Sequence, residues 1–486
     1  MNFNTLVEAV AHWAEHTPDK VCLIEADTDR KMTYIEFWQS ARVLARRLGE
    51  VGIRKGDRVV VRVTQTIETL VTAFGIYLAG GIYVPLAKNI GNHRISEALQ
   101  YFDTRYYIAS TPIEENCIFF DINAVCEEEQ CDDLVNYPDP DDVSDIFFTT
   151  GTTGLPKGVM RSFNSYCATA EAWNRSAGIT SSVVFASNSP QNLVAGIGGL
   201  QRSLFAGGTH VIGNGIVFLH SFFQTIQKCG VTSLFLNQTE LSILLNAQDA
   251  LQLFFQKVDV IILGAAKANF KDLKVIKELL PNTRILSVFN ATETSSICTY
   301  EFLLNSTDSL CVGKPDTGVE VLIMNDAREF IESSYQNPGL IACKSPTIMK
   351  GYWNNPELTV SVLNRGWLIL GDVGYADKDG FVYFMGRKDE IINSGGHKIA
   401  PIEIEKLTLE VFGVAECACV PVPDAIMGSV PKLFVVMEKD IEFSAKNIRE
   451  HLLLRLEAYK LPRIIVSIDA LPKTDANMKI NKKRLV

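Results

Sequence analysis

The sequence predicts an α/β protein with a large, multi-layered N-terminal domain, whose β-sheets are flanked by helices, and a small α+β C-terminal domain. Two observations support this prediction. Stretches with helical and with strand periodicity alternate along most of the chain, which is typical of layered α/β folds. Near residue 387 this alternation gives way to a short unit with its own pattern. Because 486 residues exceed what one core usually holds, we expect two domains, 1–387 and 388–486.

The expected elements of the N-terminal domain alternate from the start of the chain. Residues 6–13 carry apolar side chains at helical spacing and predict an amphipathic helix. A Thr-x-x-Glu capping box at 33–36 predicts a second helix that runs to residue 48, and a third is expected near 67–79. Runs of β-branched and aromatic residues predict strands at 21–26, 59–63, 83–86, 146–149, 183–186, 233–236, 258–263, 284–289 and 380–387.

The C-terminal segment has a shorter pattern. Helices are expected at 401–411 and 444–456, and strands at 415–421, 432–437 and 464–468. This set of elements has the size of a small α+β domain.

The composition is that of a globular enzyme, with 47% apolar and 21% charged residues. Asp and Glu outnumber Lys and Arg by 56 to 46, and the net charge of −10 disfavours nucleic acid or an anionic membrane as a partner. No apolar stretch approaches the roughly 18 residues of a membrane span, and the N-terminus lacks the pattern of a secretion signal. The 11 cysteines include no CxxC pair, so we expect reduced thiols and a cytoplasmic protein.

The segment TTGTTGLPKG at residues 149–158 carries the strongest chemical signal. It follows an expected strand and combines three glycines, four threonines and Lys157. Glycines let backbone N–H groups turn toward one point, hydroxyls add donors and the lysine adds positive charge, so the segment suits a polyphosphate. It is not a Walker A loop, because Lys157 is followed by glycine and the spacing differs. The alternative is a surface turn rich in glycine and threonine.

This segment resembles the phosphate loop of the adenylate-forming superfamily, which includes acyl-CoA synthetases, adenylation domains and luciferases. Four further segments resemble motifs of that superfamily and follow in its order. They are NATET at 290–294, GW and GD at 366–372, GRKDEIINSGGHKI at 386–399, and LPKT with KI at 471–480. The resemblance covers nearly the whole chain and implies a small C-terminal domain that rotates about a hinge.

The resemblance implies a site for ATP with Mg²⁺. Glu293 would hold Mg²⁺, Thr292 would contact the α-phosphate, and Lys479 would be the catalytic lysine between the α-phosphate and the attacking carboxylate. Asp372 would bind both ribose hydroxyls, and Arg387 would also contact the ribose. The other residues implied in ATP or AMP binding are Thr149, Thr150, Gly151, Thr152, Thr153, Gly154, Lys157, Gly264, Ala265, Ala266, Asn290 and Ala291.

The resemblance also assigns roles to the small domain. Asp389 would be the hinge residue, and Ser394, Gly395 and Gly396 would line the tunnel for the thiol acceptor. Each segment has a simpler interpretation when it is taken alone. NATET could be an acidic helix N-cap, the Gly-Asp pair a common turn, the Ser-Gly-Gly segment a glycine-rich hairpin, and the C-terminal lysines a solvated basic tail.

The acid pocket is implied to draw on residues 187–198, 234–238, 264–267 and 288–298, which are mostly apolar or small. Its expected residues are Asn188, Gly264, Phe289 and Thr294. Asn188 is similar to an asparagine that aryl-acid-activating members place near a ring hydroxyl. A buried asparagine more often satisfies the backbone, so the acid could be a fatty, aryl or amino acid.

The implied reaction is ATP-dependent activation of a carboxylic acid to an acyl-adenylate and pyrophosphate, followed by transfer to a pantetheine thiol. This describes an AMP-forming acyl- or aryl-CoA synthetase, a monomer or homodimer whose partners are a small carboxylic acid, ATP and CoA. The alternative acceptor is the phosphopantetheine of an acyl or aryl carrier protein. A non-catalytic nucleotide-binding relative is the alternative of another class. Departures from the superfamily's pattern at Phe163, Asn290 and Met478 would favour it.

One motif lies outside this interpretation. His12, Glu15 and His16 fit the H-x-x-E-H pattern of certain zinc proteases on an expected helix. No third ligand is evident in the sequence, so we expect a surface helix here.

Overall fold

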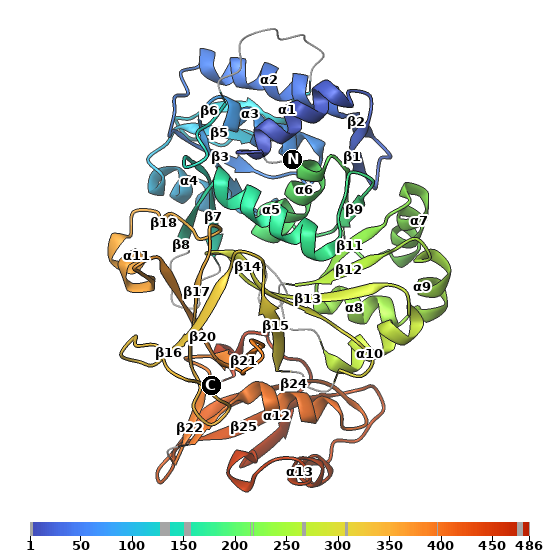
Figure 1. The fold of residues 1–486 in the computed structure, drawn as a ribbon, viewed down its shortest axis with the longest axis vertical. Coiled ribbons are helices and arrows are strands. Elements are labelled where there is room, and N and C mark those ends of the chain that lie inside the picture. The colour runs from blue at the N-terminus through green and yellow to red at the C-terminus, as the bar shows by residue number, and fades with distance from the viewer. Residues whose placement is uncertain are drawn as a thin grey trace.

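The computed structural model describes residues 3–126, 137–149, 157–213, 215–216, 218–264, 269–306, 310–395, 397–473 and 480–485. The described strands form three sheets. The N-terminal elements lie at one end of an elongated molecule and the C-terminal elements, in orange and red, at the other (Figure 1). The α/β class, with a large N-terminal and a small C-terminal domain, is therefore confirmed.

A seven-stranded sheet near the N-terminal end has the order β18-β8-β7-β4-β3-β5-β6. From β7 to β6 its strands pair in parallel, whereas β8 pairs antiparallel with both β7 and β18. Its strands are β3 (Arg58–Arg62), β4 (Ile82–Leu86), β5 (Tyr106–Ala109), β6 (Ile118–Asp121), β7 (Val143–Thr149), β8 (Lys157–Ser162) and β18 (Gly351–Tyr352).

A 14-stranded sheet forms the middle of the molecule, with the order β16-β17-β20-β21-β15-β14-β13-β12-β11-β9-β10-β1-β2 and β19 on β20. From β1 to β13 the neighbours pair in parallel, and these strands are largely buried apolar residues, as parallel strands covered on both faces usually are. From β13 to β16 the neighbours pair antiparallel. Its strands are β1 (Val21–Glu25), β2 (Lys31–Thr33), β9 (Val184–Ser187), β10 (Thr209–Ile212), β11 (Ser233–Leu236), β12 (Val260–Leu263), β13 (Arg284–Ala291), β14 (Ser295–Glu301), β15 (Cys311–Pro315), β16 (Glu320–Met324), β17 (Gly339–Lys344), β19 (Leu363–Asn364), β20 (Trp367–Ala376) and β21 (Val382–Arg387).

The C-terminal sheet has five described strands, in the order β23-β22-β25-β24 with β26 on β25. Its centre is the long antiparallel pair β24–β25. Ile404, Leu433 and Ile448 belong to the buried apolar cluster that joins this sheet to two helices. Its strands are β22 (Ile392–Ser394), β23 (His397–Ile399), β24 (Val414–Asp424), β25 (Gly428–Met437) and β26 (Ile464–Ser467).

The helices begin where the sequence provides caps. The Thr33 side chain accepts from the Glu36 backbone N–H, and Glu36 bonds back to Thr33, so the capping box is confirmed. No described helix is long and apolar enough to cross a membrane. The α-helices are α1 (Leu6–His16), α2 (Tyr34–Glu50), α3 (Ile67–Leu78), α4 (Asn92–Tyr101), α5 (Phe163–Ala177), α6 (Val194–Ala206), α7 (Leu219–Cys229), α8 (Gln238–Leu245), α9 (Gln248–Phe254), α10 (Phe270–Leu279), α11 (Pro356–Val362), α12 (Pro401–Leu409) and α13 (Ala445–Leu453). Short 3₁₀ helices span Ile122–Ala124, Ala458–Lys460 and Lys482–Arg484.

A polar contact joins the C-terminal unit to the loop between β16 and β17. The Tyr335 hydroxyl donates to Glu403 Oε2 at 2.6 Å, and the Lys460 ammonium donates to the Tyr335 hydroxyl. Lys460 is 2% exposed and also lies 3.1 Å from Glu403 Oε1 and 2.7 Å from Glu457 Oε2. A buried cation with several carboxylate partners fixes this arrangement of the two parts.

The described cysteines are free and mostly buried. Desolvation raises the pKa of the Cys22, Cys298 and Cys419 thiols. Thiols in such surroundings are inert, since the thiolate is the reactive form.

Candidate active site

Four of the predicted residues lie at one edge of the large sheet. β9, β11, β12 and β13 pair in parallel. Asn188 directly follows β9, Gly264 directly follows β12, and Phe289 and Asn290 lie near the end of β13. These residues therefore share the carboxyl edge of the sheet, where α/β folds bind ligands.

The packing at this edge is tight. A Cβ atom at Gly264 would lie 2.8 Å from Cε2 of Phe235, so only glycine fits beside that ring, and it would lie 3.7 Å from Nδ2 of Asn290. The Phe289 ring packs on Phe384 with 5.6 Å between ring centroids. Asn290, which stands where the superfamily has glycine, is exposed beside Gly264.

Thr292, Glu293 and Thr294 form the turn between β13 and β14, so NATET is not a helix N-cap. The Thr292 carbonyl accepts from Arg161 Nη1 at 3.2 Å, and the Glu293 carbonyl accepts from the Met349 backbone N–H at 2.7 Å. The buried Thr294 hydroxyl lies 2.9 Å from the Thr347 hydroxyl. Thr294 therefore supports the turn in this structure.

Tyr352 orients the Glu293 carboxylate. Its hydroxyl donates to Glu293 Oε1 at 2.7 Å, and Tyr352 is 6% exposed. Desolvation and the charge of Glu293 raise the pKa of Tyr352, so the hydroxyl stays protonated and donates. The Lys157 ammonium lies 5.6 Å from the centroid of the Tyr352 ring. One tyrosine thus joins the end of the predicted phosphate loop to Glu293.

Asp372 and Arg387 face each other across the β20–β21 hairpin. Arg387 Nη1 donates to Asp372 Oδ1 at 3.0 Å. Desolvation would lower the pKa of Arg387, but the charges of Asp372, Asp389 and Glu293 raise it overall. The charge of Glu293 also contributes to the raised pKa of Arg387, so the two side chains lie within electrostatic range of each other.

The residues present fit a bound Mg²⁺. Glu293 offers a carboxylate whose Oε1 is already oriented by Tyr352. Hard divalent cations take carboxylate and phosphate oxygens, and Mg²⁺ usually uses one or two protein carboxylates together with substrate phosphates.

Several predicted residues lie outside the described part of the chain. They are Thr150, Gly151, Thr152, Thr153, Gly154, Ala265, Ala266, Gly396, Met478 and Lys479. Thr149 ends β7 and pairs with Lys157 at the start of β8, so the two ends of the predicted phosphate loop are neighbours. The chain before and after Lys479 is also joined, because Lys473 and Ile480 form an antiparallel bridge.

The predicted hinge and tunnel residues lie next to each other in the chain. Asp389 follows β21, where the Glu390 backbone N–H donates to the Arg387 carbonyl at 2.9 Å. Ser394 ends β22 and is buried. Gly395 has a φ of 56°, in the left-handed region that favours glycine.

Sequence reasoning missed four residues that the structure brings to the site or its supports. Arg161 and Tyr352 contact the Thr292–Glu293 turn, and the Tyr335–Lys460 contact joins the two parts of the chain. No local sequence pattern pointed to these residues, since β8 itself reads KGVMRS and Arg161 does not stand out in it. Phe163, at the position of the superfamily's histidine, is buried and packs its edge on Tyr77 with 5.2 Å between centroids.

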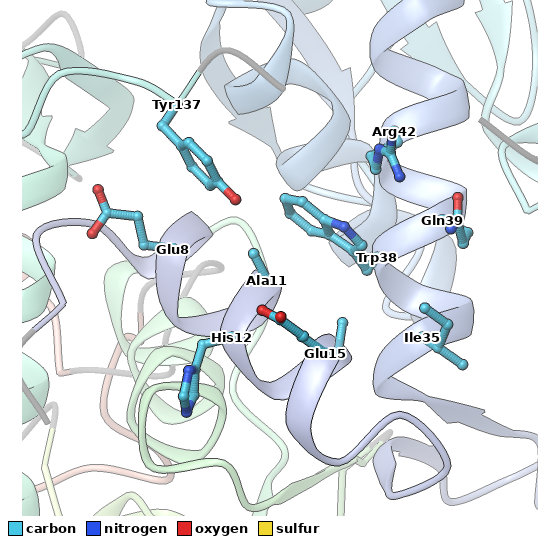
Figure 2. Close-up of a pocket in the computed structure, with 10 residues that line it drawn as sticks. Glu8, Ala11, His12, Glu15, Ile35, Trp38, Gln39, Arg42 and Tyr137 are labelled. Atoms are coloured by element: carbon cyan, nitrogen blue, oxygen red, sulfur yellow. The ribbon is translucent and has the colours of Figure 1, made fainter. Parts of the chain in front are cut away.

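A pocket of about 630 Å³ lies elsewhere, between α1 and α2. Figure 2 shows Trp38 and Tyr137 facing each other across it, with His12 and Glu15 on α1. The His12 and His16 rings stack with 4.0 Å between centroids. The H-x-x-E-H motif lies on α1, and no group of three metal-ligating side chains occurs among the described residues.

Comparison with known proteins agrees with this geometry. Residues 10–353 match the model of the AMP-binding enzyme family, and residues 403–477 match that of the AMP-binding enzyme C-terminal domain. The 2-succinylbenzoate–CoA ligase of Bacillus licheniformis is 29% identical to this chain, over 97% of each protein. The o-succinylbenzoate CoA synthetase of Bacillus subtilis, solved with its acyl-adenylate intermediate, superposes with a TM-score of 0.87 at 26% identity, over 98% of this chain and 97% of that one. The same enzyme solved with ATP and a magnesium ion also gives 0.87 at 26%, over 98% of each chain.

The fold and the site define an ATP-dependent acid–thiol ligase of the AMP-forming class. Such an enzyme activates a carboxylic acid as an acyl-adenylate and then transfers the acyl group to the thiol of CoA. The chain belongs to the AMP-binding enzyme family.

Proposed function

We propose that this ligase activates an aromatic carboxylic acid of the succinylbenzoate class. The 2-succinylbenzoate–CoA ligase that is 29% identical to this chain along nearly its whole length supports this acid. The carboxyl edge of the sheet agrees with it, because Phe289 and Phe384 offer aromatic surface and Asn188 and Asn290 offer polar groups.

The observation that carries the nucleotide chemistry is the position of Glu293 on the turn after β13 and of Asp372 opposite Arg387 in the β20–β21 hairpin. Glu293 carries a carboxylate at the turn, and the Asp372–Arg387 pair lies within its electrostatic reach. We propose that Asp372 and Arg387 bind the ribose and that Thr292 contacts the α-phosphate. Glu293 would hold Mg²⁺, which when bound neutralises phosphate charge.

The chemistry then needs no nucleophile from the protein. The carboxylate of the acid attacks the α-phosphorus, the bond to the β-phosphate breaks, and pyrophosphate leaves. The thiol of CoA then attacks the acyl carbon and AMP leaves. Positioning and charge stabilisation supply the catalysis.

We further propose that the domain boundary lies at 387/388 and that Asp389 is the hinge. The Lys388 ammonium lies 2.7 Å from Asp326 Oδ1. The residue directly before Asp389 is thus bonded to the large N-terminal domain, which supports a hinge at Asp389. Rotation about it would exchange Lys479 for the Ser394–Gly395 face. The free described cysteines and the acidic net charge support a cytoplasmic location.

Acid-dependent exchange of pyrophosphate into ATP tests the first half-reaction. We expect 2-succinylbenzoate or a closely related aryl acid to support exchange well above a panel of fatty and amino acids. Exchange with a fatty acid alone would contradict the proposed acid class. CoA and a phosphopantetheinylated carrier protein, supplied separately, distinguish the acceptors, and faster turnover with the carrier would contradict CoA.

A further inference from the structure

A buried arginine lies directly behind the Thr292–Glu293 turn. Arg161 is fully buried in β8. Its Nη1 donates to the Thr292 carbonyl at 3.2 Å, and its Nε donates to the Ser165 hydroxyl at 3.2 Å. Its guanidinium lies 5.0 Å from the centroid of the Tyr166 ring. The planar fork is thus held at two points, one of which is the backbone of the turn.

The charge of Arg161 has a partner on the neighbouring strand. Asp145 of β7 is fully buried and stands opposite Arg161 in the strand register. The Tyr77 hydroxyl donates to Asp145 Oδ1. Desolvation raises the pKa of the Asp145 carboxyl to about 6, although its hydrogen bonds and the charge of Arg161 act in the opposite direction.

Stability alone does not explain this arrangement. Two buried groups of opposite charge are often no more stabilising than apolar residues of similar volume, because both groups lose their hydration. Arg161 Nη2 also has no hydrogen-bond partner among the described residues. What offsets the free-energy cost of burying Arg161 is the hydrogen bond that its guanidinium donates to the Thr292 carbonyl.

Further contacts hold the rest of the turn. The Met349 backbone N–H fixes the Glu293 carbonyl and the Tyr352 hydroxyl fixes the Glu293 carboxylate, and both residues belong to the segment around β18, which pairs with β8. Ser295, which closes the turn, has a φ of 80°, a conformation that costs free energy for a residue other than glycine. A turn with such backbone strain depends on its supports.

We propose that Arg161 is a positioning residue that fixes the Thr292 end of the turn and so sets where Thr292 and Glu293 meet Mg²⁺ and ATP. This inference rests on the proposed roles of Thr292 and Glu293. It predicts a defect in the use of Mg·ATP and none in the use of the acid.

The test compares two variants with the wild type. Asp145→Asn/Arg161→Met removes both charges together, so that neither is left unpaired. We expect its Kd for Mg·ATP, measured by calorimetry without acid, and its KM for ATP to rise roughly 10- to 100-fold, as for the loss of a hydrogen bond to a charged group. The KM for the acid stays within about twofold. Arg161→Lys keeps the charge but loses the rigid fork, and we expect a rise of at least about threefold.

Tyr34→Phe is the matched control, because it removes a buried bond from a side chain to a carbonyl, that of Gly208, without touching the turn. Its Kd for Mg·ATP should equal that of the wild type. If both Arg161 variants fold and bind Mg·ATP within about twofold of the wild type, the inference is overturned. If the double variant does not fold, Arg161→Lys alone decides. A wild type that binds no Mg·ATP would overturn the proposed function instead.

Discussion

At the scale of single residues, the Arg387 side chain orients the Asp372 carboxylate. Arg387 occupies Oδ1 of the carboxylate at 3.0 Å. The carboxylate therefore keeps a fixed orientation, and preorganised groups bind with less loss of conformational freedom.

Asp372→Asn should weaken ATP binding, since it would replace the proposed charge-assisted bonds to the ribose with neutral ones. We expect a rise in the KM for ATP of roughly 10-fold or more, with little change in the KM for the acid. Steady-state kinetics with each substrate varied in turn measures this. Asp29→Asn is the control, because Asp29 pairs with Lys228 on the surface and should leave both constants within about twofold. An unchanged KM for ATP in Asp372→Asn would refute the ribose role.

His210 makes the fold sensitive to acid. It is fully buried in β10 and stacks on Phe185, and desolvation lowers its pKa to about 3. The unfolded chain binds a proton at this side chain below about pH 6.5, whereas the folded chain does so only near 3. The contribution of His210 therefore lowers the free energy of unfolding as the pH falls below about 6.5.

His210→Leu should remove this part of the acid sensitivity. From the two pKa values, His210 should lower the free energy of unfolding of the wild type by about 2 kcal/mol at pH 5 relative to pH 7. Urea unfolding of both proteins at the two pH values measures the difference. If the variant loses as much stability as the wild type between pH 7 and pH 5, His210 is not the group responsible.

Single residues also show which parts of the candidate site could be predicted from the sequence. Glu293 and Asp372 were predicted because their motifs are local in the sequence. Arg161 and Tyr352 were not, because their partners lie 131 and 59 residues away. Contacts of this kind come from strand order, which no local pattern specifies.

At the scale of elements, the segment after Lys479 is anchored on the small domain. The Lys482 ammonium lies 2.7 Å from Glu405 Oε1 and 3.6 Å from Glu390 Oε2. Burial would lower the pKa of Lys482, but Glu405 and Glu390 raise it overall, so the lysine stays charged. The alternative interpretation of these lysines as a solvated basic tail therefore does not hold for Lys482.

Lys482→Met should impair adenylate formation selectively, because it releases the anchor beside the proposed catalytic lysine. We expect pyrophosphate exchange to fall about tenfold or more, while transfer from a preformed adenylate to CoA stays within about threefold. Rapid-quench assays of each half-reaction measure this. Lys483→Met, an exposed neighbour, is the control. Equal losses in both half-reactions would point to general unfolding of the domain instead.

The positions of elements were better predicted than their ends. The capping box placed the start of α2, and apolar runs placed the strands of the large sheet. β13 was expected to end at 289 but continues to Ala291, because it pairs with β14 up to Ser295. β24 likewise extends to Asp424 through its long pairing with β25. Strand ends depend on the partner strand, which a single segment does not contain.

At the scale of the whole molecule, the contact of Tyr335 with Glu403 and Lys460 fixes one arrangement of the two parts. Its members lie 68 and 125 residues from Tyr335 in the chain, so sequence patterns could not predict it. If the small domain rotates as proposed, this contact must break in each cycle. Its strength therefore influences how long the enzyme remains in this arrangement.

Tyr335→Phe should make that arrangement easier to leave, because it removes the hydroxyl that both Glu403 and Lys460 use. We expect limited proteolysis between residues 388 and 400 to become roughly tenfold faster, in line with a lost bond to charged groups. Tyr459→Phe is the control, since Tyr459 stacks on His397 within the small domain. Equal cleavage rates for Tyr335→Phe and the wild type would show that the Tyr335 contact does not stabilise this arrangement.

The buried cysteines have a consequence for chemical selectivity. The acyl-adenylate is a potent acylating agent, and an exposed thiolate on the enzyme would capture it in a self-acylation reaction. Burial keeps Cys22, Cys298 and Cys419 protonated at neutral pH. These side chains therefore do not compete with the diffusing acceptor, and the enzyme avoids poisoning itself with its own intermediate at these positions.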